Sequence, residues 1–322
     1  MHPIARNHHF IPEFFLAAFT PSGTKDDLLW VTDMKEHKGY PAKPHNVGFQ
    51  KDLYRIDIDE APPDAIEQIR GWFEGYAAPA VKYVLENREL PPRPELDHLM
   101  ELVGVLIVLV PATRERVEKI LDKRMKAMFR PYYTDPEAMR ADFDKMRDEG
   151  IDVPESPDCE ELARFASNED LYTLSVDKEW MLVRMIEASM HAQRMLFKRH
   201  WSVLVAEEGA GEFICSDAPV CLTWTNSGRH ERIPRLYEHE TTVTIPLGQA
   251  VALRGQYEAI EPRRASCDLS MVGHLNTRTI GSADRFLYSG GRCFPWERDD
   301  GSIGDWDGLT ADLESLGRKQ KG

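Results

Sequence analysis

The stretch NHHFIPEFFL, residues 7–16, places two adjacent histidines directly before an apolar segment. Pro12 has no backbone N–H and fits the first turn of a helix, where that donor would lack a partner anyway. The apolar residues around and after it, Phe14, Phe15, Ala18 and Phe19, recur at helical spacing. We therefore predict a short helix that is buried from its first turn, with a polar site beside it.

His8 and His9 lie just before this predicted helix. The free N–H groups and the positive dipole end of a helix favour an anion or a carboxylate there. An imidazole in such a place can act as a general base or as a metal ligand, and Asn7 would help to position it. The alternative interpretation is that one histidine is a capping or core residue and the other is solvated.

The composition limits the classes of function that the chain can serve. A chain of 322 residues with 42% hydrophobic and 29% charged residues has the composition of a soluble globular protein with a substantial core. The net charge of −14 argues against strong non-specific binding to DNA or to an anionic membrane. The longest apolar run, residues 102–110, is too short to span a bilayer, and the first residues lack the apolar core of a signal peptide. We expect a cytoplasmic protein.

The five cysteines form no Cys-x-x-Cys pair and are odd in number. Neither a disulfide framework nor a zinc ribbon is therefore expected, and the cysteines are interpreted as small buried hydrophobic residues. The chain also lacks phosphate-loop, dinucleotide-binding, Gly-x-Ser-x-Gly and His-Glu-x-x-His motifs. A nucleoside triphosphatase, a simple dehydrogenase, an α/β-hydrolase and a zincin are disfavoured.

The middle of the chain, residues 61–200, is predicted to be helical. Asp64 would cap a helix that runs to about Glu86, and a second helix would begin at Glu95 and be kinked at Pro111. The apolar stripe of the first helix is expected to contain Ile66, Ile69, Trp72, Phe73 and Tyr76. Residues 119–158 are rich in charge and are interpreted as a surface excursion or a lid, with a loop at residues 150–157.

Arg114 follows the apolar segment and the predicted kink. A guanidinium near a core needs a carboxylate, a phosphate or several carbonyl groups as partners. Arg114 is our preferred anion-binding residue, and a structural salt bridge is the alternative. His191 falls among the apolar positions of a predicted helix at residues 177–200. It is interpreted as a hydrogen-bonded core residue unless it approaches His8 or His9, where it would contribute to substrate binding.

The second half of the chain changes to the two-residue period of strands. We predict an antiparallel sheet built from residues 201–205, 212–215, 220–223, 242–245 and 250–253. Earlier, residues 28–31 and 53–56 are expected to pair as a ribbon. Residues 263–282 are predicted to be helical, and the tail from Trp296 to be loosely ordered.

Two polar residues in this half are candidates for the site. Asp217 ends an apolar strand, with a proline two residues later, and an aspartate so placed can orient a histidine, coordinate a metal or accept hydrogen bonds from turn amides. Asn276 lies inside a predicted helix, which is unfavourable unless its amide has a partner. It would support His8 or Asn7.

Four motifs resemble those of the DUF4238 family, a widespread and poorly characterised group. They are NHHFIP at residues 7–12, FICSDAPV at residues 213–220, IPL at residues 245–247, and Leu275-Asn276 followed by Ala283, Arg285 and Tyr288. The resemblance spans most of the chain in the right order. It implies one family domain and little about function.

The pattern as a whole predicts an α+β fold, with a helical bundle packed on a mainly antiparallel sheet and the N-terminal segment docked between them. We expect a single domain over residues 1–322. Its parts would be an N-terminal helix and ribbon (1–60), a helical part (61–200), a β-rich part (201–295) and the tail (296–322).

The leading functional hypothesis is a hydrolase, for example a nuclease, that acts on a phosphate-containing substrate such as a nucleotide or RNA. His8, His9 and Asp217 would be catalytic, Arg114 would bind the anionic group, and a divalent metal ion is compatible with this set. The alternative is a non-catalytic binding or interaction protein, including a component of a defence or toxin system. The sequence predicts neither the substrate nor the oligomeric state.

Overall fold

The computed structural model describes residues 6–59, 61–153, 158–225, 233–259 and 261–312. Its contacts divide the chain into two units, one of Met1–Ala112 with Leu182–Gly322 and one of Thr113–Met181. The strands found among the described residues all belong to the first unit. The two units are therefore described separately.

The larger sheet of the first unit has five strands in the order β10-β5-β9-β8-β7. In that order the strands are Arg264–Cys267, His200–Ala206, Val251–Gln256, Thr241–Gly248 and Cys221–Trp224. β10 runs parallel to β5, and the other neighbours are antiparallel. Every residue of β8 is buried, as in a central strand that is covered on both faces.

A second, fully antiparallel sheet has four strands in the order β3-β2-β11-β6. In that order its strands are Lys38–Ala42, Leu29–Asp33, Phe286–Ser289 and Cys215–Ser216. Two further pairs are β1 (Asn7–His9) with β4 (Phe49–Lys51), and β12 (Trp296–Glu297) with β13 (Ile303–Gly304). Strands from both ends of the chain therefore meet in one sheet.

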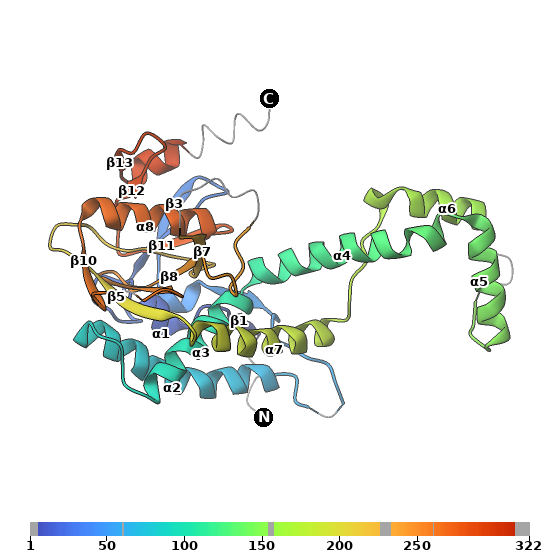
Figure 1. Ribbon diagram of the computed structural model, residues 1–322, viewed down its shortest axis with the longest axis horizontal. Helices are drawn as coiled ribbons and strands as arrows, with labels where there is room; N and C mark the ends of the chain where they lie inside the picture. The colour runs from blue at the N-terminus through green and yellow to red at the C-terminus, as the bar shows by residue number, and fades with distance from the viewer. Residues whose placement is uncertain (1–5, 60, 154–157, 226–232, 260, 313–322) are drawn as a thin grey trace. The chain divides into compact units, whose positions relative to one another are not determined.

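Helices cover the strands of the first unit on two sides. The helices are α1 (Glu13–Ala17), α2 (Ala65–Asn87), α3 (Glu95–Val108), α7 (Lys178–Leu196) and α8 (Leu269–Ser282), with a short 3-10 helix η1 (Pro44–Asn46). Figure 1 shows α8 on one side of the strands and α2 with α3 on the other. The first residues of α7 belong to the second unit.

The helix α1 contacts both α2 and β8. At this contact a Cβ atom on Gly248 would lie 3.1 Å from the carbonyl oxygen of Ala18 and 3.0 Å from a methyl group of Leu85, so a larger residue would require these neighbours to move. The α+β fold is thus confirmed, with the N-terminal helix between helices and sheet. The short helix after Pro12 is also confirmed, and Phe15 and Phe19 are fully buried.

The second unit contains most of α4 (Pro111–Tyr133), together with α5 (Pro136–Asp148), α6 (Cys159–Ser167) and a 3-10 helix η2 (Glu169–Leu171). The carboxylate of Asp135 accepts a hydrogen bond from the Glu137 N–H at 2.9 Å and caps α5. The Lys126 ammonium group is buried and donates to the carbonyl oxygens of Glu169 and Tyr172. These hydrogen bonds join residues of the second unit to one another. Of the loop predicted at residues 150–157, residues 154–157 lie outside the described part of the chain.

The predicted ribbon between residues 28–31 and 53–56 was wrong. β2 pairs with β3 and β11, while residues 53–56 form no strand. The reason is visible at Tyr54, whose backbone N–H donates to the ring of His8 instead of to a neighbouring strand.

The predicted apolar stripe of α2 was rotated around the helix axis. Ile69, Trp72 and Tyr76 are exposed. The buried positions of the helix are Ile66, Arg70, Phe73, Ala77, Ala80, Val81 and Val84. The small residues Ala77 and Ala80 of this face fit against the neighbouring helix and sheet, so the large aromatic side chains lie on the opposite face.

Three other boundaries differ from the predictions. Residues 264–267 are the strand β10, because the Asp268 side chain accepts from the Met271 N–H and starts α8 only there. Pro111 begins a new helix instead of kinking one. The described part of the tail from Trp296 forms the β12–β13 pair, and Trp306 packs on Trp30 while its indole N–H donates to Thr32.

Among the described residues, no single helix is long and apolar enough to cross a membrane. Only α3 and α4, taken together as a bent pair, satisfy the length and composition requirements. The apolar residues of α3 are largely buried in the core of the first unit.

Candidate functional site

The most polar group of side chains near the N-terminus lies where β1, α1 and η1 meet. The backbone brings these elements together, because the N–H groups of Phe10 and Ile11 both donate to the carbonyl oxygen of Gly48, at 2.8 and 3.2 Å. His9 pairs with Phe49 across the β1 and β4 strands. We call the side chains of His9, Glu13 and His45 the triad.

The three side chains of the triad approach one another closely. Glu13 Oε1 lies 2.9 Å from His45 Nδ1 and 3.7 Å from His9 Nε2. His9 Nε2 is also 3.2 Å from the backbone oxygen of His45, so it donates a hydrogen bond there. The candidate ligand atoms all lie within 4.8 Å of one another. Two imidazoles and a carboxylate at this spacing are a donor set for a divalent metal ion.

Exposure differs within the triad. The His45 side chain is mostly open to solvent, whereas that of His9 is mostly buried. Burial lowers the pKa of His9, and the nearby Glu13 carboxylate opposes this shift. The lowered pKa of His9 favours the neutral imidazole, which is the form that accepts protons or binds metal ions.

His8, the neighbour of His9, has a different role. Its ring is buried, stacks on the ring of Tyr54 with centroids 5.9 Å apart, and accepts a hydrogen bond at Nδ1 from the Tyr54 N–H at 2.8 Å. The Tyr54 hydroxyl in turn donates to the carbonyl oxygen of Leu109. His8 thus fixes the chain between β4 and α2 against the helical core.

A buried guanidinium also packs on the ring of Tyr54. Arg70 is only 6% exposed, and its guanidinium carbon lies 4.4 Å from the centre of the Tyr54 ring. Its Nη2 is 3.6 Å from Glu74 Oε1, whereas its Nη1 has no hydrogen-bond partner among the described residues. Arg70 also lowers the pKa of His9 through its charge, a smaller effect than burial.

Two carboxylates of α2 accompany Arg70. Burial raises the pKa of Glu74. The charge of Arg70 opposes this shift, and the charges of Glu67 and Glu13 reinforce it. Glu67 Oε2 is buried and has no hydrogen-bond partner in the part of the chain that the structure describes. Polar atoms that are buried without partners are rare in folded proteins, and they commonly mark a place where water, an ion or a ligand binds.

Asp217 accepts three backbone hydrogen bonds, from the N–H groups of Asp284, Arg285 and Phe286 at 2.8, 2.8 and 2.9 Å. Burial raises the pKa of this carboxyl group, and the three donors oppose the shift. These contacts match the turn-amide interpretation of Asp217. Its described hydrogen bonds include none to His8 or His9, so the proposed pairing with a histidine has no contact to support it.

Asn276 has the buried amide partners that its position in α8 requires. Its oxygen accepts from the Ile214 N–H at 3.1 Å, and its Nδ2 donates to the carbonyl oxygens of Glu212 and Pro295, both at 2.8 Å. It holds α8 against the segments before β6 and β12. None of these hydrogen bonds goes to His8 or Asn7, which Asn276 was expected to support.

The other predicted site residues have separate surroundings. Asn7 is exposed at the start of β1. Arg114 lies in the second unit and donates to Glu118 at 2.8 Å, as in the salt-bridge interpretation. His191 is exposed, in contrast to its predicted place on the apolar face of its helix, and contacts the carbonyl oxygen of Glu187 one turn earlier.

The sequence signals for Glu13, His45 and Arg70 were weak. Glu13 lies inside the N-terminal motif, four residues after His9, which is the spacing of neighbours on a helix. Arg70 occurs four residues after Ile66 and three before Phe73, so it falls within the buried face of α2. His45 has no local signal, because only the pairing of β1 with β4 brings it to Glu13.

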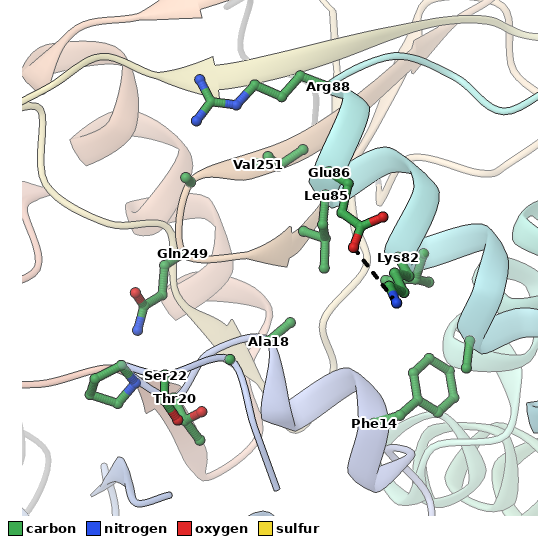
Figure 2. A pocket seen from close by; sticks show the side chains of 15 residues that line it. Phe14, Ala18, Thr20, Ser22, Lys82, Leu85, Glu86, Arg88, Gln249 and Val251 are labelled. Carbon is green, nitrogen blue, oxygen red and sulfur yellow. Dashed lines mark ion pairs between the residues drawn. The ribbon is translucent and has the colours of Figure 1, made fainter.

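Two hollows lie near α1. The larger, of about 660 Å³, has among its apolar lining residues Phe14, Ala18, Val81, Leu85 and Val251. Lys82, Glu86, Arg88 and Gln249 also line it, and Figure 2 shows the ion pair between Lys82 and Glu86. None of the triad residues lines this hollow, so its size alone does not make it the place of chemistry.

The smaller hollow, of about 180 Å³, is closer to the triad along the chain. Five aromatic side chains contribute to its wall, namely Phe10, Tyr40, Phe49, Phe286 and Tyr288. The Phe49 ring also meets the His9 ring edge-on, with centroids 5.5 Å apart. Asn46, the residue after His45, also lines this hollow, so η1 contributes to both the hollow and the triad. We call this space the aromatic hollow.

Comparison with known proteins gives a family and no further relative. No curated protein and no solved structure is significantly similar to the chain. The sequence model described as "Protein of unknown function (DUF4238)" matches residues 7–292, which include the triad, Arg70, Asp217 and Asn276. The chain therefore belongs to the DUF4238 family.

Proposed function

We propose that this protein is a hydrolase that acts on a phosphate-containing substrate, with a nucleotide preferred, at the triad and Arg70. One observation carries the proposal. A mostly buried imidazole with a lowered pKa, a carboxylate and a second imidazole converge beside a buried guanidinium with an unpartnered N–H group. This combination supplies a base or metal ligand and an anion-binding group within one cluster.

In this proposal His9 takes the proton of the attacking water when no metal ion is bound. The lowered pKa of His9 suits this role, because a general base must be unprotonated at the working pH. With an ion at the triad, His9 would instead hold the ion, which would lower the pKa of the bound water. Glu13 holds the imidazole and stabilises its positive charge after proton transfer. The mostly exposed side chain of His45 leaves this side of the triad accessible to a substrate.

Arg70 takes the role that the sequence assigned to Arg114. The Arg114 guanidinium is already paired with Glu118, whereas Arg70 Nη1 is buried without a partner. A buried guanidinium with an unmet donor is costly, and a phosphate oxygen is the acceptor that such a planar group binds best. His8 and Asp217 are positioning residues of the scaffold in this proposal.

The aromatic hollow favours a nucleotide over a simple phosphate ester. Its volume of about 180 Å³ is of the size of one planar ring system, and aromatic side chains stack on nucleobases. Phe49 connects it to His9. If a nucleobase binds in the aromatic hollow, the phosphate group of the same nucleotide would extend toward the triad.

The test is a hydrolysis screen with the full chain. Purified protein, with and without divalent metal ions, is incubated with nucleotides, dinucleotides, short RNA and simple phosphate esters, and the products are separated by chromatography. We expect turnover that falls about 100-fold or more in His9→Ala, in line with the loss of a general base. The matched control is His274→Ala, because His274 pairs with Glu297 at 2.7 Å on α8, outside the cluster. No turnover by folded wild type, or full turnover by His9→Ala, would refute the proposal.

A second candidate function is favoured by one observation. The exposed side of α2 carries Ile69, Trp72 and Tyr76, which are 64%, 68% and 45% exposed, and the Trp72 and Tyr76 rings touch. An exposed apolar helix face is typical of a protein that binds a partner. In this alternative the chain is a non-catalytic interaction protein, for example within a defence or toxin system. The wild type would then bind a partner through α2 and hydrolyse none of the substrates in the screen.

A further inference from the structure

We infer that the triad is a binding site for one divalent transition-metal ion, with zinc as the best match. The inference uses the same residues as the proposed function but concerns the ion alone. It would hold for a metal-binding protein without hydrolase activity. The argument has four parts: the scaffold, the spacing, the chemistry of the donors and the local charge.

The scaffold places three separate elements at fixed positions. His9 ends β1, Glu13 begins α1, and His45 lies within η1 between Pro44 and Asn46. The two hydrogen bonds to the Gly48 carbonyl oxygen and the β1–β4 pairing hold these elements together independently of the triad. The ligand side chains are thus brought together before any ion binds, which lowers the cost of binding.

The spacing fits a tetrahedral ion. Bonds of about 2.1 Å at tetrahedral angles place ligand atoms about 3.4 Å apart. The triad has separations of 2.9 and 3.7 Å at Glu13, and no pair of candidate ligand atoms exceeds 4.8 Å. Rotations of the side chains would therefore bring all three atoms to bonding distance without a change of backbone.

The donor atoms select the kind of ion. Two imidazoles with one carboxylate are the ligands of many catalytic zinc sites and leave a fourth position for water or substrate. Magnesium and calcium prefer sites made of oxygen atoms alone. Iron(II) uses the same three ligand types in a six-coordinate arrangement, so the spectroscopy below distinguishes it by geometry.

The local charge gives an independent reason to expect a cation. The partly buried carboxylate Glu74 feels the charges of Glu67 and of the triad residue Glu13, and Arg70 is the cation that opposes them. Carboxylates thus lie near enough to the triad to favour a cation there. The unpartnered Oε2 of Glu67 shows that the described side chains do not fully satisfy this group. A divalent ion would compensate it.

The test measures binding of the metal alone. The full chain is stripped with a chelator and titrated with Zn²⁺ by calorimetry, and with Co²⁺ by visible absorption, which reports a tetrahedral site. We expect one strong site per chain. Loss of a ligand in His45→Ala should weaken its Kd by at least about 100-fold, because even outer ligand partners cost 10- to 100-fold. His274→Ala, which removes an imidazole from a pair of similar length, should leave the Kd unchanged.

The controls separate this inference from the proposed function. The His45 side chain is 73% exposed, so its removal should not unfold the chain, and Glu13→Gln provides a second variant if it does. Ion binding without hydrolysis supports the site and refutes the hydrolase. Undiminished hydrolysis by stripped protein that binds no Zn²⁺ in the titration refutes the site and leaves the hydrolase. No strong Zn²⁺ site, or one unchanged in both variants, overturns the inference.

Discussion

His45 Nδ1 lies 2.9 Å from Glu13 Oε1, although 32 residues separate the two side chains in the sequence. His45 follows Pro44 in a 3-10 helix, and Glu13 is the first residue of α1. The contact exists because β1, which precedes Glu13, pairs with β4, which follows His45. It joins the N-terminal histidine motif to a histidine that the sequence pattern marks only as a surface residue.

Glu13→Gln should separate chemistry from stability at this contact. The substitution keeps the shape of the side chain but removes its charge, so we expect hydrolysis to fall at least about tenfold. Loss of a carboxylate from the first turn of a helix costs only about 0.3–1 kcal/mol. The melting temperature should therefore fall by no more than about 2–4 °C. Calorimetry and the hydrolysis assay measure the two effects, and a large loss of stability with unchanged turnover would contradict the assignment.

Arg70→Met should weaken substrate binding and leave the fold intact. The change leaves the partly buried Glu74 without its cation, so the unfolding free energy should fall, by less than the loss of about 3–5 kcal/mol for a fully buried pair, and KM is measured on the folded variant. The KM for a phosphate-containing substrate should rise at least about tenfold, because the phosphate oxygen loses a charged donor. Arg114→Met is the matched control. It removes a helical i,i+4 ion pair and should change the unfolding free energy by about 0.5 kcal/mol or less, with no change in KM.

Asp217→Ala should destabilise the protein rather than inactivate it. Three backbone N–H groups would lose their acceptor, at about 1–3 kcal/mol for each buried donor left unsatisfied. We expect a loss of at least about 3 kcal/mol in urea unfolding, with turnover per folded molecule retained. Asp217→Asn keeps one acceptor oxygen, so its unfolding free energy should lie between those of wild type and Asp217→Ala. Normal stability with lost turnover would restore the catalytic role that the sequence suggested for Asp217.

Asn276→Leu should also act on stability. The variant leaves the Ile214 N–H and two carbonyl oxygens without their partners, and we expect a loss of about 2–4 kcal/mol. Asn7→Ala, at an exposed position of β1, is the control and should stay within about 0.5 kcal/mol of wild type. Denaturant unfolding of the two variants side by side makes the comparison, and equal effects would contradict the structural assignment of Asn276.

Glu212 should make stability depend on pH. Burial raises its pKa from 4.5 to about 7, against the donors Gly290 and Gly291. The folded state then binds the proton more tightly than the unfolded state. The stability linked to this group is fully present below about pH 4.5 and is lost as the pH rises through about 7.

Glu212→Gln mimics the protonated carboxyl group and tests this dependence. The gain in melting temperature of the variant over wild type should be small at pH 5 and should grow toward pH 8. The gain corresponds to at most about 3 kcal/mol, since one pKa unit equals 1.36 kcal/mol. A difference that is constant between pH 5 and pH 8 would contradict the raised pKa.

Local patterns in the sequence predicted most of the elements. The apolar periodicity of residues 201–205, 242–245 and 250–253 gave the positions of β5, β8 and β9, and Glu95 marked the start of α3. The prediction was wrong where a side chain replaced a backbone partner. At residues 53–56, the His8 ring takes the Tyr54 N–H that a strand would have used.

The candidate site was predicted in part. His9 came from the N-terminal motif, and the family match extends over it. His45 and Arg70 could not be predicted, because an exposed histidine and an arginine within a helix have no local pattern that marks function. Asp217 and Asn276 did stand out as polar residues in apolar settings, but their hydrogen bonds go to backbone groups.

The sequence by itself determined the family, the α+β class and the buried N-terminal helix, because these follow from motifs and periodicity within short stretches. Only the tertiary structure decided which polar residues meet. Contacts between distant residues depend on strand pairing and helix packing, and the β1–β4 pair brings Glu13 and His45 together while Arg70 lies buried against Tyr54. A periodic pattern specifies which face of an element is buried, but it does not specify what lies opposite that face.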